Sequence, residues 1–334
     1  MGVTFPDLPR IYTHLVHPNE LWQSDRASAR IARGALLPLS ALYAFGWEAY
    51  LAVYRLGLKR AAEPHAPVVC VGNLVSGGSG KSPVTLHLAA LLREMGREVV
   101  ISASGYGGPR AEAATLAPEG PLSAREWGDE PAMIRWLLPE VPLVVGRRRV
   151  LAAELVHEHH PQAVMLMDDG FQHLPLKKHL SIVLDPERPK NPWCLPAGPY
   201  REGRWNRRRA DLVLPGQFRV EAEPLHLIRP DGASAERPVR MSALCALGQP
   251  EGFFRALGDA EPRVALPDHD PLDAGNLLGR LPADRPVVVT AKDWVKLRER
   301  PDVGEREFLI ARHSVRIEPA DEFRAWLETR LDGR

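Results

Sequence analysis

Residues 71–83 have the sequence VGNLVSGGSGKSP, a Gly-rich stretch that ends in Gly-Lys-Ser. It follows residues 66–73, a short apolar run that is typical of a buried strand, and it precedes residues 82–96, which have the pattern of a helix. Pro83 would lie in the first turn of that helix, where its missing N–H does no harm. A loop between a strand and a helix N-terminus can direct backbone N–H groups at an anion. The stretch therefore predicts a phosphate-binding loop.

The residue types in this loop suit a nucleotide phosphate. Glycines let the backbone curl without Cβ clashes, a lysine supplies positive charge, and a serine hydroxyl can bind magnesium. The residues expected to hold the nucleotide are Gly77, Gly78, Ser79, Gly80, Lys81 and Ser82. The usual motif G-x-x-x-x-G-K-[ST] would place a glycine where this chain has Val75. A plain Gly-rich turn is the alternative, but the strand before the loop and the helix after it favour a binding site.

Strand-like and helix-like segments alternate from residue 60 onward, and this alternation predicts an α/β fold. We expect a parallel sheet like that of P-loop NTPases, with helices on both faces. The C-terminal third is mixed but less regular, which predicts a second, smaller α/β domain. The expected divisions are an N-terminal segment, residues 1–60, a phosphate-binding core, residues 61–178, and the second domain, residues 179–334, which would contribute to the active-site cleft.

Paired aspartates end another apolar run. Residues 164–167 are apolar, and Asp168 and Asp169 follow at the expected end of the strand. Ligands of open α/β sheets collect at the carboxyl ends of the strands, and a carboxylate there can hold magnesium. Helix capping is the alternative for either aspartate alone. Two adjacent carboxylates near a phosphate-binding loop favour the metal.

The composition is that of an ordinary folded protein. The net charge is +1, so no global field indicates a nucleic-acid partner. The few cysteines are far apart and favour a reducing compartment over a disulfide framework. We see no secretion signal at the N-terminus.

Residues 34–47 carry no charge and are followed by further aromatic residues. The stretch is shorter than the roughly 20 apolar residues that a spanning helix needs. Arginines before it and aromatic residues within it suit a helix that lies in a membrane interface. A buried amphipathic helix of a soluble domain is the alternative.

Other polar clusters are ambiguous by themselves. Asp129 and Glu130 precede a helix and can be capping residues, and His269 is an isolated loop histidine. Residues 157–160, HEHH, do not have the H-E-x-x-H spacing of a zinc site. The arginine clusters at 146–149 and 200–209 can be solvated surfaces or anion sites.

The motifs GNLVSGGSGKSP, SGYGG, GDEP, DDGFQH, LPAGPYRE, PDHD and TAKDWVK together resemble the tetraacyldisaccharide 4'-kinases, which phosphorylate a lipid A precursor at the inner membrane. The resemblance extends from about residue 14 to residue 300. DDGFQH and the atypical loop are its most specific parts. The family's loop also lacks the glycine that Val75 replaces.

This resemblance implies the use of ATP and Mg²⁺ and the transfer of the γ-phosphate to the 4'-hydroxyl of an acylated disaccharide 1-phosphate. Carried onto this chain, it assigns Lys81 to the β- and γ-phosphates and Ser82 to the metal. Asp129 of GDEP would be the general base, paired with His269 of PDHD, and a positioned carboxylate is what a poorly nucleophilic sugar hydroxyl needs.

Further implied roles place Asp168, Asp169 and Gln172 at the metal and phosphates, and Glu202 near the nucleotide. The resemblance also implies that the N-terminal helix contacts a membrane. The expected partners are the acylated disaccharide 1-phosphate and a membrane surface, without nucleic acid. We expect a monomer at the cytoplasmic face of the inner membrane, bound as a peripheral or monotopic protein.

Two positions depart from the family's motifs. Ser104 replaces a usual arginine, so Arg110 or Arg147 would have to substitute if that arginine contacts a phosphate. Ala291 replaces a usual glutamate. The alternative functions are a membrane-associated GTPase or ATPase switch and a non-catalytic lipid-binding protein. The chain lacks the spacing of the GTPase motifs, and a lipid-binding protein would leave the loop and the aspartate pair unexplained.

Overall fold

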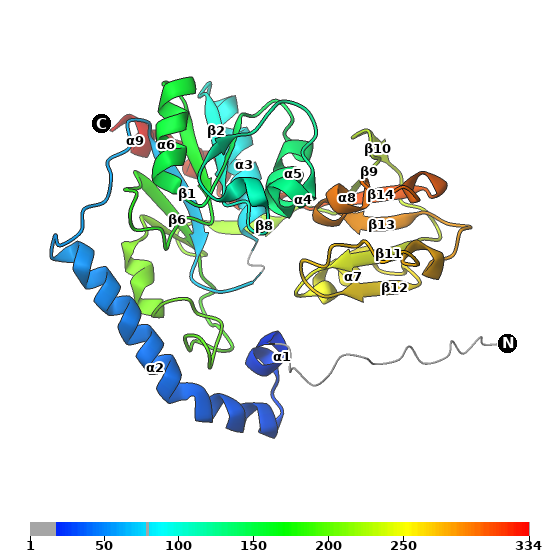
Figure 1. Cartoon of the computed structure of the whole chain (residues 1–334), viewed down its shortest axis with the longest axis horizontal. Helices are drawn as coiled ribbons and strands as arrows, with labels where there is room; N and C mark the ends of the chain where they lie inside the picture. The colour runs from blue at the N-terminus through cyan, green and yellow to red at the C-terminus, as the bar shows by residue number, and fades with distance from the viewer. Residues whose placement is uncertain (1–17, 78–79, 334) are drawn as a thin grey trace.

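The computed structural model describes residues 18–77 and 80–333. Its larger sheet has seven strands in the order β3-β4-β2-β5-β1-β6-β7 (Figure 1). These strands are β1 (Val68–Asn73), β2 (Val99–Ala103), β3 (Thr115–Leu116), β4 (Leu143–Val145), β5 (Val164–Asp168), β6 (Leu180–Leu184) and β7 (Leu212–Leu214). All neighbours pair in parallel except β3 and β4. The expected α/β fold with a parallel sheet is confirmed.

Helices cover both faces of this sheet. They are α3 (Lys81–Glu94), α4 (Ala124–Trp127), α5 (Asp129–Leu137), α6 (Arg149–His159) and α9 (Ala320–Asp332). Alternate residues of β1 point to opposite faces: Val69 and Val71 belong to the core under α3, α5 and α9, whereas Val68 and Cys70 belong to the core under α6. Because both faces are buried, the central strands consist almost entirely of apolar residues.

The second sheet has six strands in the order β10-β9-β14-β13-β11-β12. They are β9 (His226–Ile228), β10 (Ser234–Ala235), β11 (Ser242–Ala246), β12 (Arg263–Leu266), β13 (Val287–Thr290) and β14 (Phe308–Arg312), and the helices of this unit are α7 (Pro250–Leu257) and α8 (Ala291–Leu297).

Short 3₁₀ helices are η1 (Pro109–Ala111), η2 (Arg204–Arg209), η3 (Leu278–Arg280) and η4 (Val303–Glu305). Strands β8 (Arg219–Ala222) and β15 (Val315–Glu318) pair with each other, and α9 then packs on the first unit.

The first sheet extends beyond the boundary expected at residue 178. Strands β6 and β7 follow that residue, and β6 pairs directly with β1. A division at residue 178 would therefore cut through one sheet. The pairing of β6 with β1 joins segments more than 100 positions apart, for example Val69 and Leu180, and no local pattern reveals such a contact.

The N-terminal part consists of α1 (Pro18–Gln23) and α2 (Ala27–Arg55), and α2 extends along the lower side of the first unit (Figure 1). Among the described residues, α2 is the one helix long and apolar enough to cross a membrane. Only Ser40 and Leu51 of α2 are buried, so it is not the buried helix of a soluble core. It is longer than residues 34–47, and the charged residues that flank that stretch, Arg33 and Glu48, bond to the protein itself.

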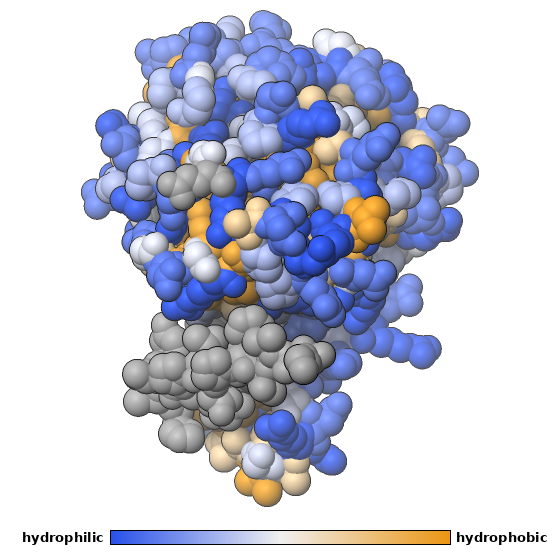
Figure 2. Space-filling view, turned by 90° about the vertical axis from the view of Figure 1, so that its right-hand side faces the viewer, coloured by the Kyte–Doolittle hydropathy of each residue, from blue (hydrophilic) through white to orange (hydrophobic). Residues whose placement is uncertain are grey.

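One face of α2 is apolar and exposed. The exposed positions between residues 31 and 49 are Ile31, Gly34, Ala35, Pro38, Leu39, Ala41, Leu42, Phe45, Gly46 and Ala49. Figure 2 shows a largely hydrophilic face above and hydrophobic side chains at the lower end, where Figure 1 places the N-terminal half of α2. Between residues 31 and 49, the polar residues Arg33, Ser40 and Glu48 bond to the protein, whereas the exposed positions are apolar.

The return of α9 to the first unit can be tested with Phe323→Ala. Phe323 is 1% exposed and packs edge-to-face on Phe218 at 5.2 Å between ring centroids. Loss of such a ring should lower the free energy of unfolding by about 3–5 kcal/mol. Urea unfolding measures this, with Glu328→Ala on the exposed side of α9 as the control. Equal stability of both variants would show that α9 contributes little to this core.

Candidate active site

The phosphate-binding loop joins β1 to α3. Gly77 has φ +100° and Gly80, the N-cap residue of α3, has φ +78°, so both need the freedom of glycine. Lys81 and Ser82 open the helix, whose N-terminus favours an anion. Gly78 and Ser79 lie outside the described residues.

Val75 stands where the standard motif has glycine, and its surroundings explain why. It forms an isolated antiparallel bridge with Tyr200. On either side of it, Ser76 N donates to Pro199 O at 2.7 Å and Arg201 N donates to Leu74 O at 2.7 Å. The start of the loop is thus extended backbone held by another segment, and such backbone needs no glycine.

Asp168 and Asp169 lie beside this loop because β5 pairs with β1. The Asp168 carboxylate accepts a hydrogen bond from Thr85 Oγ1 at 2.9 Å and lies 3.5 Å from Ser82 Oγ. Asp169 has φ +50°, a conformation rare for residues other than glycine. Its carboxylate lies 3.6 Å from Lys81 Nζ. The structure therefore brings the predicted residues Lys81, Ser82, Asp168 and Asp169 together.

The local charges favour a cation at this place. Burial and the nearby carboxylates of Glu130 and Asp169 raise the pKa of Asp168 to about 7. A cation would relieve this concentration of negative charge. No group of three or more His, Cys, Asp or Glu side chains is arranged to hold a metal within residues 18–77 and 80–333. A magnesium ion would thus need oxygen ligands from Ser82, water or a phosphate, as is usual for this ion. The residues present fit that requirement.

Two arginines support the aspartate pair. Arg201 donates to Asp169 with both terminal nitrogens, at 3.0 and 3.2 Å. Arg149 is buried and donates to the carbonyl oxygen of Asp168 at 2.7 Å and to Ser102 Oγ at 2.9 Å. Sequence reasoning singled out neither residue, although both lie in the arginine clusters that it left open.

The two arginines expected to replace the one missing at Ser104 lie elsewhere. Arg110 is paired with Glu126 at 3.0 Å in an exposed ion pair, and Arg147 is exposed. Within the part of the chain that the structure describes, neither side chain bonds to the aspartate pair. Of the arginines near position 104, Arg149 is the one that reaches the end of β5.

Asp129 and His269 meet across the two units. Asp129 opens α5, and its carboxylate lies 3.3 Å from Nδ1 of His269, which lies in the loop after β12. His269 has φ +62°, an unusual conformation that the surrounding contacts must hold. Gly128 lets the start of α5 approach the loop at residues 105–106, because a Cβ there would lie 2.8 Å from Tyr106 O. The predicted pairing of GDEP with PDHD is therefore present as a contact.

Lys296, which the sequence analysis missed, joins the same cluster from α8. Its buried ammonium lies 3.7 Å from the Asp129 carboxylate and 3.4 Å from that of Asp293, and it donates to Asp270 O at 2.7 Å. Burial alone would raise the pKa of Asp129. The hydrogen bond with His269 and the charges of Lys296 and Lys292 outweigh burial, so this pKa lies below its ordinary value.

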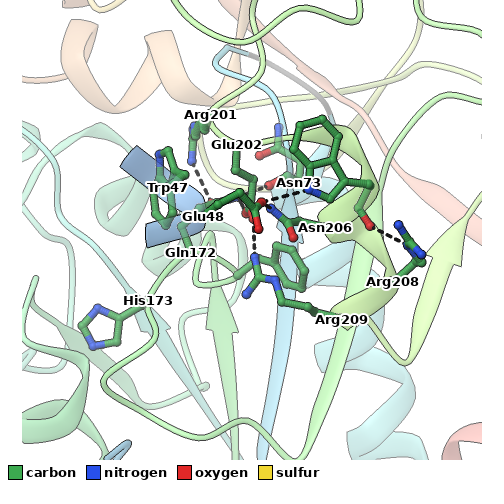
Figure 3. A network of polar contacts seen from close by, with 12 residues as sticks. Trp47, Glu48, Asn73, Gln172, His173, Arg201, Glu202, Asn206, Arg208 and Arg209 are labelled. Carbon is green, nitrogen blue, oxygen red and sulfur yellow. Dashed lines mark hydrogen bonds and ion pairs between the residues drawn. The ribbon is translucent and has the colours of Figure 1, made fainter. Parts of the chain in front are cut away.

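Glu202 is buried behind the loop rather than open to a ligand. It is 0% exposed, and its two oxygens accept hydrogen bonds from Arg209 and from Gln172 Nε2 (Figure 3). Gln172 also donates to Asn73 O at 2.7 Å. This geometry favours an indirect role for Glu202, in which it orients Gln172, over direct contact with a nucleotide.

Comparison with known proteins identifies the family. The model of the tetraacyldisaccharide-1-P 4'-kinase family matches residues 32–332. The chain belongs to this family. A tetraacyldisaccharide 4'-kinase of Aromatoleum aromaticum is 35% identical over 87% of this chain and 92% of that protein. The corresponding protein of Delftia acidovorans is 37% identical over 79% of this chain and 82% of its own length.

A solved structure supports the same assignment. LpxK from Aquifex aeolicus, described as an "apo" form in complex with ATP, is 27% identical, with a TM-score of 0.76 over 90% of this chain and 99% of that one. As a member of the family, the chain is a phosphotransferase with an alcohol acceptor, a tetraacyldisaccharide 1-phosphate. The alternative of a GTPase-like switch is not supported.

The role of Lys296 can be tested with Lys296→Met. Without this ammonium, less positive charge opposes the effect of burial on the Asp129 carboxylate, so the pKa of Asp129 should rise. If the ionised carboxylate of Asp129 is the form that acts in catalysis, the acidic limb of the pH dependence of kcat/KM should move to higher pH. The measurement is kinase activity across a pH series, with Lys177→Met in an exposed ion pair as the control. An unmoved acidic limb would contradict the coupling of Lys296 to Asp129.

Proposed function

We propose that this kinase transfers the γ-phosphate of ATP to the 4'-hydroxyl of its acylated disaccharide 1-phosphate, with Asp129 as the general base. The Asp129–His269 contact carries this proposal, since it supplies an oriented carboxylate close to a phosphate site. Glu130, next to Asp129 in the first turn of α5, is near enough to the end of β5 for its charge to raise the pKa of Asp168.

In this mechanism the Asp129 carboxylate accepts the proton of the sugar hydroxyl, and His269 fixes the orientation of that carboxylate. The low pKa of Asp129 keeps it ionised and able to accept a hydrogen bond from the hydroxyl. Phosphoryl transfer depends mainly on positioning and on neutralising charge, so a strong base is not required. His269 belongs to the second unit, which thereby contributes to the active-site cleft.

On the nucleotide side, Lys81 binds the β- and γ-phosphates, and the backbone from Gly77 to Ser82 surrounds them. Ser82, Asp168 and Asp169 would hold Mg²⁺, directly or through water. When bound, Mg²⁺ neutralises charge on the phosphate oxygens. Glu202 acts from behind by holding Gln172 against the end of β1.

Two substitutions test the proposed base and the proposed nucleotide site separately. Asp129→Asn should lower kcat by about 10²–10⁴-fold with ATP binding retained, since it removes the proton acceptor but keeps the shape of the side chain. Lys81→Ala should instead weaken ATP binding. The assay is transfer of ³²P from γ-labelled ATP to a tetraacyldisaccharide 1-phosphate in detergent micelles with Mg²⁺.

The matched control is Asp231→Asn in an exposed turn. Unchanged turnover in Asp129→Asn would rule out its role as base. Label released as free phosphate, with none in the lipid, would contradict the kinase assignment itself.

The exposed apolar face of α2 supports binding to a membrane surface. A helix with one apolar face lies in the interface plane, and the inner face of α2 is bonded to the protein, so we infer monotopic or peripheral binding without crossing. We also propose that the chain lies at the cytoplasmic face of the inner membrane, where its lipid substrate can be reached. We further propose that it acts as a monomer.

Membrane binding can be tested with Phe45→Asp. Phe45 is 70% exposed, so a charge there should leave the fold intact while opposing insertion into the interface. Partition into phospholipid vesicles should fall clearly, as measured by sedimentation. Val239→Asp, at a position 98% exposed on the second unit, is the control. Equal partition of both variants would show that another surface binds the membrane.

A further inference from the structure

Residues 191–209 lie between α2 and the phosphate-binding loop. On the side of α2, Ser40 Oγ donates to Cys194 O at 2.6 Å. Two turns further along the helix, Glu48 Oε1 accepts hydrogen bonds from Trp205 Nε1 at 2.9 Å and from Asn206 Nδ2 at 2.6 Å. Figure 3 shows Glu48 pointing from α2 into this network. The helix with the apolar outer face is thus bonded to this segment at two points.

On its other side, the same segment holds the active site. Its residues 199–201 bond to residues 74–76 of the phosphate-binding loop through backbone groups. Arg201 also fixes the Asp169 carboxylate. A shift of this segment would therefore move both the loop and the aspartate that faces Lys81.

The 3₁₀ helix η2 joins the two sides. Near its centre, Asn206 bonds to Glu48, and at its end Arg209 bonds to Glu202 and lies over the Phe171 ring at 4.5 Å. Glu202 in turn holds Gln172, which bonds to the end of β1. These contacts form one connected path from α2 to the DDGFQ motif.

The path is stiff because η2 is held elsewhere as well. Arg204 and Arg207 both contact the Asp185 carboxylate, at 2.9 and 3.1 Å, and the Asp185 side chain is 0% exposed. Because η2 is joined to its surroundings at several points, we expect a displacement at Asn206 to move its neighbours as well.

Glu48 is the one acidic residue in α2, and it holds a buried partner. Asn206 is 2% exposed, so loss of the acceptor would leave its amide unpaired in the interior. We propose that Glu48 is a positioning residue for phosphoryl transfer. Through Glu48 the position of α2 sets the position of η2, and η2 in turn sets the positions of the phosphate-binding loop and of Asp169. The proposal rests on the proposed function for its kinetic readout.

The test compares Glu48→Ala and Glu48→Gln in the full-length protein. Glu48→Ala should lower kcat about ten- to a hundredfold, because small misplacements at a reacting centre are costly. Partition into phospholipid vesicles should stay unchanged, since the outer face of α2 is intact. Glu48→Gln keeps an acceptor oxygen for Asn206 and should recover most of the activity. Glu63→Ala, which breaks an exposed ion pair, is the control.

Hydrogen exchange gives a readout that does not depend on activity. In Glu48→Ala the amides of Ser76 and Arg201 should exchange faster, because their bonds join residues 199–201 to the loop. The amides of the second sheet should be unaffected.

The inference is overturned if kcat of Glu48→Ala stays within about twofold of Glu63→Ala, or if kcat falls only in proportion to vesicle binding. A general rise in exchange over both sheets, or no recovery in Glu48→Gln, also overturns it. Wild-type protein that transfers no phosphate to the lipid would refute the proposed function instead. The exchange of Ser76 and Arg201 would then still decide the role of Glu48.

Discussion

Strand β1 pairs with β5 in parallel, with Val71 opposite Asp168, and the layout of the active site follows from this pairing. Parallel strands end at the same edge of a sheet, so the phosphate-binding loop and the aspartate pair emerge side by side. The carboxylate of Asp168 is buried there and needs compensation. Thr85 from α3 donates a hydrogen bond to this carboxylate, and Arg149 from α6, which donates to the Asp168 carbonyl oxygen, adds a nearby positive charge from the opposite face of the sheet. A bound cation would further compensate the negative charge of Asp168.

The second unit meets this arrangement through helix packing. Helix α5 starts at Asp129, and its apolar residues Met133, Trp136 and Leu137 pack on the core of the second unit. The same contact brings α8 to Asp129, so that one interface both joins the units and surrounds the proposed base. The buried Lys296 is costly to desolvate unless paired, and it has partners in both units. Its position therefore links the orientation of the units to the charge of Asp129.

The local sequence was enough to predict features that lie within a single segment of the chain. The loop from Gly77 to Ser82 follows from its glycines and its flanking elements, and the aspartates at the end of β5 follow from the apolar run before them. The Asp129–His269 pair needed the family resemblance, because 140 positions separate the two residues. Sequence reasoning did not identify the roles of Arg149, Lys296 and Glu48, because charged residues in a helix usually face water. Their functions depend on partners that only the tertiary structure brings close.

The paired strands β8 and β15 have a further consequence. The chain leaves the first unit at Ala222 and re-enters it at Val315, and these two residues lie opposite each other in the ribbon. In topological terms the second sheet is an insertion, closed at its base, within a continuous nucleotide-binding domain. Evolution can lengthen, trim or exchange such a module without disturbing the order of the host's strands. The inserted unit that carries His269 can therefore vary in length while the host keeps the order of its strands.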